Sequence, residues 1–414
     1  ALRDEDGAEA AGLRLRLGAH LAKKLSLAVS QDTALPEAGP RHGADLAHRV
    51  LTALDAGDHG DEVRCEVLTE CRWGLYDYEP PSELLRMSQQ LLEAAVRLGD
   101  PYFRGEALVA LAIDQLRVGR VHSAWSTVDL HRKHAARSGS ALARWQQCTL
   151  DTLFDLWGGK FESAADWIFG ESREVVGALE ADLAVPADTL QQTRLGQAYW
   201  LLREEGRMDE LFSSGLAENV ERHGFFPVWR AGMALALCET GDLGPAADRL
   251  VAFADDTEGF TALPPYGWAL PAMALLAEVC AALDAHGGYG DALARVLPGL
   301  RRAMGRQPEG IALAGWPTVL IGPTARALGL LDLAAGDTAG ALRRFREAER
   351  PAGDSPPQMA RLRLAQARAL MRSAPKGRGR AVAGLLGTAL SAAERYGMKA
   401  LARECRVQLE RAPG

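Results

Sequence analysis

The chain has 414 residues and a formal net charge of −7, and 48% of its residues are hydrophobic while 6% are aromatic. The length suits two or three ordinary domains or one long repeat array, and the abundance of Ala and Leu favours helices over a large sheet. The acidic balance argues against a domain held on nucleic acid by phosphate contacts, because such domains are usually basic.

The N-terminal segment 1–40 is predicted to form a helix followed by a linker. It begins with Ala-Leu-Arg-Asp-Glu-Asp, which is charged where a secretory signal needs a basic region and an apolar stretch. It also lacks an initiating Met, which is consistent with a piece cut from a longer protein. The six cysteines form no Cys-x-x-Cys pair and are typical of buried, reduced thiols, so we expect a cytoplasmic protein.

Residues 41–414 contain a long series of amphipathic helices of roughly 12–20 residues, separated by turns rich in Gly and Pro. Strand-type alternation is nearly absent. Two charge-free stretches, 259–276 and 310–325, are interrupted by Pro and Gly, so neither is predicted to span a membrane. No segment has the composition of a long linker, and we therefore expect one continuous domain over 41–414.

A local pattern recurs along this domain: a glycine ends one helix, and an alanine follows five residues later on the next helix. The pairs are Gly119/Ala124, Gly159/Ala164, Gly241/Ala246, Gly287/Ala292 and Gly336/Ala341, with Gly206/Leu211 as a looser sixth. Glycine can end a helix in the left-handed conformation without steric cost, and the small alanine lets the second helix lie close to the first. Because one such pair cannot bury its apolar face, neighbouring pairs are expected to stack. The sequence predicts an all-α, right-handed solenoid of antiparallel helix pairs with irregular repeats of about 35–49 residues.

The clearest copy spans 322–350. Leu328 and Gly329 lie on its first helix, and Ala341, Phe345 and Ala348 lie on its second. This arrangement resembles the tetratricopeptide consensus of Leu-Gly followed by Ala, Phe and Ala.

Four segments carry a wider resemblance. They are 195–211 (beginning Leu-Gly-Gln-Ala-Tyr-Trp), 227–241, 322–331 and 392–398. In this order they resemble the C-terminal helical region of large actinobacterial signal-transduction ATPases, over about residues 40–410. Those proteins carry tetratricopeptide-like repeats after a nucleotide-binding domain, together with a LuxR-type, SARP-type or nucleotide-cyclase module. The resemblance implies a region that senses a ligand or partner and restrains or releases the ATPase. The ATPase and the DNA-binding module are both missing from this chain.

Common catalytic motifs are absent from the sequence. The sequence has no phosphate-binding loop with its Lys and hydroxyl, no His-Glu-x-x-His helix and no Gly-x-Ser-x-Gly elbow. His131 and His134 are three residues apart, but no third metal ligand is near in sequence. We therefore predict binding rather than catalysis, without a cofactor or metal.

Two kinds of binding surface are predicted. The first is the concave groove formed by the first helices of the pairs, and two apolar, aromatic segments at 263–271 and 313–323 are expected to line a pocket there or to anchor loops on the helices. The groove and pocket residues are Leu153, Leu156, Trp157, Tyr266, Trp268, Trp316, Arg326, Leu330 and Leu333.

The second is a basic segment, 341–380, with eleven Arg or Lys and three acidic residues. It is either a solvated helix face or a docking surface for an acidic partner, a phosphate ligand or DNA, and the scarcity of aromatics argues against stacking on single strands. Its central residues are Arg343, Arg344, Arg346, Arg361, Arg363 and Arg368.

The expected role is a sensing and interaction domain of a multidomain transcriptional regulator. Its partners would be its own ATPase and effector domains or another protomer, together with a small-molecule effector. No membrane partner and no direct nucleic-acid contact are expected. The alternatives are a stand-alone tetratricopeptide adaptor that scaffolds other proteins and, third, an enzyme or an accessory domain of one.

Overall fold

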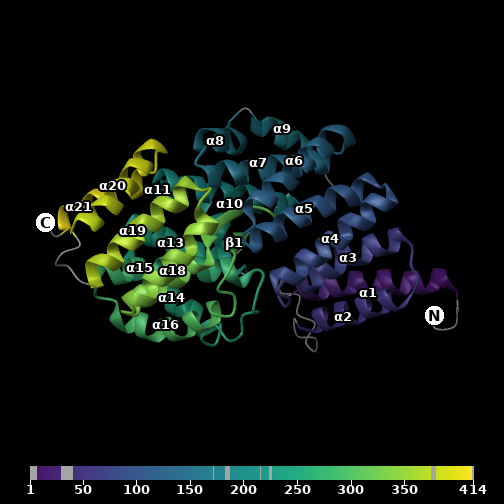
Figure 1. Cartoon of the computed structure of the whole chain (residues 1–414), viewed down its shortest axis with the longest axis horizontal. Coiled ribbons are helices and arrows are strands. Elements are labelled where there is room, and N and C mark those ends of the chain that lie inside the picture. Colours follow the sequence, from purple (N-terminus) through teal and green to yellow (C-terminus); the bar gives the residue numbers. More distant parts are fainter. Residues whose placement is uncertain are drawn as a thin grey trace. The chain divides into compact units, whose positions relative to one another are not determined.

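The computed structural model describes residues 7–28, 41–170, 172–181, 187–214, 216–222, 226–373 and 379–412. Over these ranges the protein is all-helical, with 21 helices and one two-stranded hairpin, and neighbouring helices pack against one another (Figure 1). The predicted helical class is thereby confirmed. The right-handed solenoid stays a prediction.

The chain divides into two compact units. Unit 1 comprises Ala1–Gln147 and Pro264–Gly267. Its helices are α1 (Ala8–Ala28), α2 (Arg41–Ala56), α3 (Asp61–Leu75), α4 (Pro81–Leu98), α5 (Pro101–Arg117), α6 (Val121–Ser138) and the first part of α7 (Ala141–Gly158). From α1 to α6 each helix packs against the next one, and α1 also packs against α3.

A buried polar cluster connects helices α3, α4 and α5 of unit 1. Arg72 of α3 donates to both carboxylate oxygens of Asp114 of α5, at 2.8 and 2.5 Å, and Ser88 of α4 donates to Asp114 at 2.6 Å. Arg117 stacks on the ring of Tyr76, with its Cζ 4.2 Å from the ring centroid. Because Arg72, Ser88 and Asp114 are buried, each of these three depends on the others for its hydrogen bonds.

Unit 2 comprises Cys148–Leu263 and Trp268–Gly414. After the end of α7 its elements are α8 (Phe161–Phe169), α9 (Ser172–Ala181), α10 (Ala187–Glu205), α11 (Asp209–Ser213), α12 (Leu216–Arg222), α13 (Pro227–Thr240), α14 (Leu243–Asp256), α15 (Ala269–His286), α16 (Gly290–Met304), β1 (Ile311–Ala314), β2 (Val319–Pro323), α17 (Thr324–Ala334), α18 (Thr338–Ala352), α19 (Pro356–Ser373), α20 (Gly379–Arg395) and α21 (Lys399–Arg411). Helices α13, α15 and α17, which are the first helices of successive pairs, pack on one another in turn.

The glycine turns adopt the conformation that the sequence predicts. Their φ angles lie between 69° and 94° at Gly119, Gly159, Gly206, Gly241 and Gly336. In each of these turns the residue after the glycine donates its N–H to the carbonyl five positions earlier, which is the Schellman arrangement. The alanines that follow are fully buried at positions 124, 164, 246 and 341, as is Leu211.

Two turns depart from the predicted set. Gly287 has a positive φ of 82° but an extended ψ of 169°, and its partner Ala292 is only partly buried. Conversely, Gly397 has a φ of 72°, the N–H of Met398 reaches the carbonyl of Ala393, and Ala402 is buried. This further copy was not predicted, and Gly397 lies farther from Gly336 than the 35–49 residues that separate the predicted glycines.

The hairpin β1–β2 also departs from the expectation of a loop at 313–323. The strands are antiparallel, with a bulge after Ala312 and a turn at Gly315, whose φ is 70°. Every strand residue is buried. A strand buried on both faces shows no polar–apolar alternation, so its period is invisible in the sequence.

Two buried glutamines hold the hairpin to helices. The side-chain amide of Gln197 in α10 donates to the carbonyl of Thr318 at 3.3 Å, and that of Gln358 in α19 donates to the carbonyl of Ile321 at 3.1 Å. The hairpin also packs against α15, α17 and α18. It therefore forms part of the interior of unit 2.

We predict that Gly329→Ala destabilises unit 2, because a Cβ at this position would lie 2.5 Å from the ring of Phe345. Overpacking costs about 1–3 kcal/mol, which exceeds the ~1 kcal/mol gained from helix propensity. We expect a lower midpoint of thermal unfolding. The control is Gly384→Ala in α20, where a Cβ meets nothing within 4 Å and the midpoint should not fall. A midpoint for Gly329→Ala at or above that of the wild type would contradict the close approach of α17 and α18.

Candidate ligand pocket

The interior of unit 2 contains a row of paired charges on stacked helices. Arg203 of α10 donates from Nε to Glu239 of α13 at 2.6 Å, and its Nη2 lies 3.4 Å from Glu278 of α15. Arg326 of α17 donates to the other oxygen of Glu278 at 2.6 Å. The carboxylate of Glu278 thus joins the first helices of separate pairs through two guanidinium groups.

The ionisation of Glu278 follows from these neighbours. Burial alone would raise the pKa of its carboxyl, but Arg326 and Arg203 outweigh that effect and hold the pKa well below its ordinary value of 4.5. The same carboxylates keep the pKa of Arg203 above its ordinary value despite burial. Glu278 and Arg203 therefore both remain charged at neutral pH.

Contacts distant in sequence tie the C-terminal helices to α7 and α10. Arg361 of α19 donates to Glu204 of α10 at 2.8 Å, and Ser355 donates to the carbonyl of Trp157 at 2.7 Å. The turn at Gly206 lies so close to Ala400 of α21 that a Cβ on the glycine would be 2.7 Å from the Ala400 nitrogen. As a result, α10 is held at its C-terminal end by several elements of unit 2.

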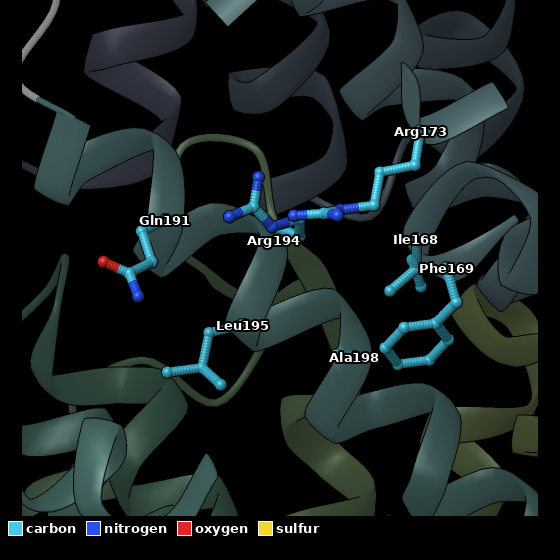
Figure 2. Close-up of a pocket in the computed structure, with 7 residues that line it drawn as sticks. All are labelled: Ile168, Phe169, Arg173, Gln191, Arg194, Leu195 and Ala198. Carbon is cyan, nitrogen blue, oxygen red and sulfur yellow. The ribbon is translucent and has the colours of Figure 1, made fainter. Parts of the chain in front are cut away.

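Close to the other half of α10 lies an open cavity of about 270 Å³. Its residues come from three helices: Ile168 and Phe169 of α8, Arg173 of α9, and Gln191, Arg194, Leu195 and Ala198 of α10. Figure 2 shows Arg173 extending toward Arg194, with the ring of Phe169 near Ala198 and with Gln191 at the opposite edge.

The pocket has an apolar floor and a cationic wall. Ile168, Leu195 and Ala198 are buried, with exposed fractions of 2%, 5% and 3%. Arg194 is paired with Glu180 through Nη1 at 2.8 Å, whereas Arg173 is exposed to solvent. Apolar surface next to a few directed polar groups is the usual composition of a small-molecule site. This arrangement is suited to holding a ligand.

The sequence did not predict this pocket. Its residues are spread from 168 to 198 over three helices and follow no single helical spacing. Two signals were present: Gln191, Arg194, Leu195 and Ala198 follow the spacing of one helix face, and arginines stand on both sides of the segment 180–188, which contains Pro186. Residues 182–186 of that segment lie outside the described ranges.

The predicted groove residues do not come together on an open surface. Leu153, Leu156 and Trp157 of α7 are buried, as are Arg326, Leu330 and Leu333 of α17. Leu156 belongs to the larger hydrophobic core, while Leu330 and Leu333 belong to a separate cluster with Phe345.

The three aromatic residues of the predicted pocket are half-buried. Tyr266 belongs to unit 1, where its N–H donates to the carbonyl of Asp77 at 3.1 Å, whereas Trp268 and Trp316 belong to unit 2. The concave groove itself stays a prediction.

The basic segment is divided between the surface and the interior. Arg343 and Arg346 of α18 are exposed, and Arg344 pairs with Glu347 along the same helix. The remaining three are partly buried in α19, each with a carboxylate partner. These pairs are Arg361–Glu204, Arg363–Glu349 and Arg368–Glu404. Lys376 and Arg378 lie outside the described residues.

The described residues contain no group of three or more His, Cys, Asp or Glu placed to hold a metal ion. Among the described helices, α15 is long and apolar enough to cross a membrane, yet 72% of it is buried inside the protein, as in the core helix of a globular domain.

No protein-family model matches the sequence, and no curated protein matches it.

We predict that Glu278→Gln lowers the free energy of unfolding of unit 2 by about 3–5 kcal/mol, because two guanidinium groups remain buried without their shared carboxylate. Native-state hydrogen exchange of α10, α15 and α17 measures this loss. The control is Glu221→Gln, which removes an exposed ion pair with Arg249 and should cost about 0–1 kcal/mol.

The effect of Glu278→Gln has a defined pH dependence. Since the folded-state pKa of Glu278 lies below 4.5, its contribution is complete above that pH and is lost as the pH falls further. The difference between wild type and variant should therefore shrink in acid. An equal cost for the Glu278 and Glu221 variants at pH 7 would show that the interior pairs do not hold the helices.

Proposed function

We propose that this chain is the ligand-sensing interaction domain of a multidomain regulator and that it acts by binding. The observation that carries the proposal is the open pocket between α8, α9 and α10, where two arginines face an apolar floor. A preformed cavity with few polar groups, set in a rigid helical framework, is the usual form of a sensor site.

The regulatory part of the proposal draws on two further observations. The turns of the helix pairs repeat one geometry, and α13, α15 and α17 stack in sequence, which is how tetratricopeptide-like arrays are built. The sequence also resembles the helical region of actinobacterial signal-transduction ATPases in the order of four segments. Within such a protein the domain would pass ligand occupancy to the ATPase and its DNA-binding module.

We predict that Gln191→Trp blocks ligand binding. Gln191 is exposed at the rim of the pocket, so a larger side chain would fill the opening without disturbing the core. A fractionated metabolite extract from the native host should contain a fraction that raises the thermal midpoint of the wild type and not that of the variant. A ligand at 100 times its dissociation constant adds about 2.7 kcal/mol to stability.

The controls separate pocket binding from other effects. Arg343→Gln, on the exposed face of α18, should respond to the extract as the wild type does. Equal shifts in the wild type and in Gln191→Trp, or no shift with any fraction, would contradict the sensor role. A natural reading frame that begins near residue 1 would contradict the multidomain part and favour the adaptor.

A further inference from the structure

The charge of the pocket is set by two arginines in different situations. Arg194 is held by Glu180, which occupies one of its terminal nitrogens and leaves its other N–H groups for a ligand. Arg173 forms no ion pair with any described residue. Glu180 is not among the residues that line the pocket, and the charged side chains in the described part of the lining are these two arginines.

Such a wall is complementary to an anionic group. A guanidinium group donates two parallel N–H bonds, which match the two oxygens of a carboxylate. Arg194 is preoriented by Glu180, whereas Arg173 extends from a neighbouring helix toward it (Figure 2). The pair can therefore grip one carboxylate from two sides.

The remainder of the pocket requires an apolar group. The buried floor of Ile168, Leu195 and Ala198 offers no charged atom, and Phe169, which is 53% exposed, continues this surface to the edge. The cavity has a volume of about 270 Å³. This size fits a medium-length acyl chain or one aromatic ring.

We propose that the pocket binds a small carboxylate with an apolar tail, with its carboxylate between Arg173 and Arg194 and its tail on Ile168, Leu195 and Ala198. The assignment rests on the proposed function and names the ligand class of the same site. A neutral sugar would leave both the apolar floor and the two guanidinium groups without a matching partner.

Titration calorimetry of the full chain with three probes tests the head and the tail separately. Octanoate carries both parts, octanamide keeps the tail without the charge, and acetate keeps the charge without the tail. Octanoate should bind at least tenfold more tightly than either of the others. Equal affinity for octanoate and octanamide, or no measurable binding of octanoate, overturns the proposal.

Variants then assign the binding to this pocket. Arg173→Gln and Arg194→Gln should each weaken octanoate binding at least tenfold, since each removes a charged partner. Arg173 is exposed, so its loss leaves folding intact, and Arg343→Gln serves as the matched control of equal charge change. Unchanged octanoate affinity in Arg173→Gln and in Arg194→Gln would place the binding elsewhere and overturn the proposal.

Failure of the ligand class is distinguishable from failure of the sensor role. In one outcome, an extract component fails to bind Gln191→Trp and yet binds Arg173→Gln and Arg194→Gln as it binds the wild type. That result would preserve the sensor role and reject the carboxylate ligand class. An extract component that loses affinity in all three variants supports both.

Discussion

The carboxylate of Glu278, held between two buried guanidinium groups, is the interaction on which unit 2 depends most. It joins α10 to α17 through α15, and without it Arg326 would lose its carboxylate partner in the interior while Arg203 would keep only Glu239. Because the pairing fixes α10 at Arg203, it also fixes the half of α10 that faces the pocket. A structural ion pair and a candidate binding site thus share one helix.

Contacts along the length of α10 fix the position of the helix that contributes most of the described lining of the pocket. Near its C-terminal end, Glu204 pairs with Arg361, and near its middle the side-chain amide of Gln197 donates to the hairpin. In its N-terminal half, Arg194 pairs with Glu180. A binding side chain is most effective when its neighbours already fix its orientation, so a ligand would meet Arg194 in place. Arg173, on the shorter and more exposed α9, supplies the adaptable side of the pocket.

Local chemistry explains what the sequence could predict. A glycine that must take a left-handed conformation, followed by a small residue that must be buried, marks a helix pair within a few residues, and the turns at Gly119, Gly159, Gly206, Gly241 and Gly336 follow that rule. Features formed by residues far apart in the sequence could not be predicted. The hairpin gives no alternation because both of its faces are buried, and the partners Arg203 and Glu278 lie far apart in sequence. The pocket depends on how three helices meet, which no spacing in one segment encodes.

The central claim, that this protein works by holding a ligand between α8, α9 and α10, is tested most directly by the electron density of crystals grown with octanoate. The account predicts density for a carboxylate between the guanidinium groups of Arg173 and Arg194, continuing as a chain over Leu195 and Ala198. A pocket that is empty at saturating octanoate, or density for the molecule in a different part of the protein, would contradict it.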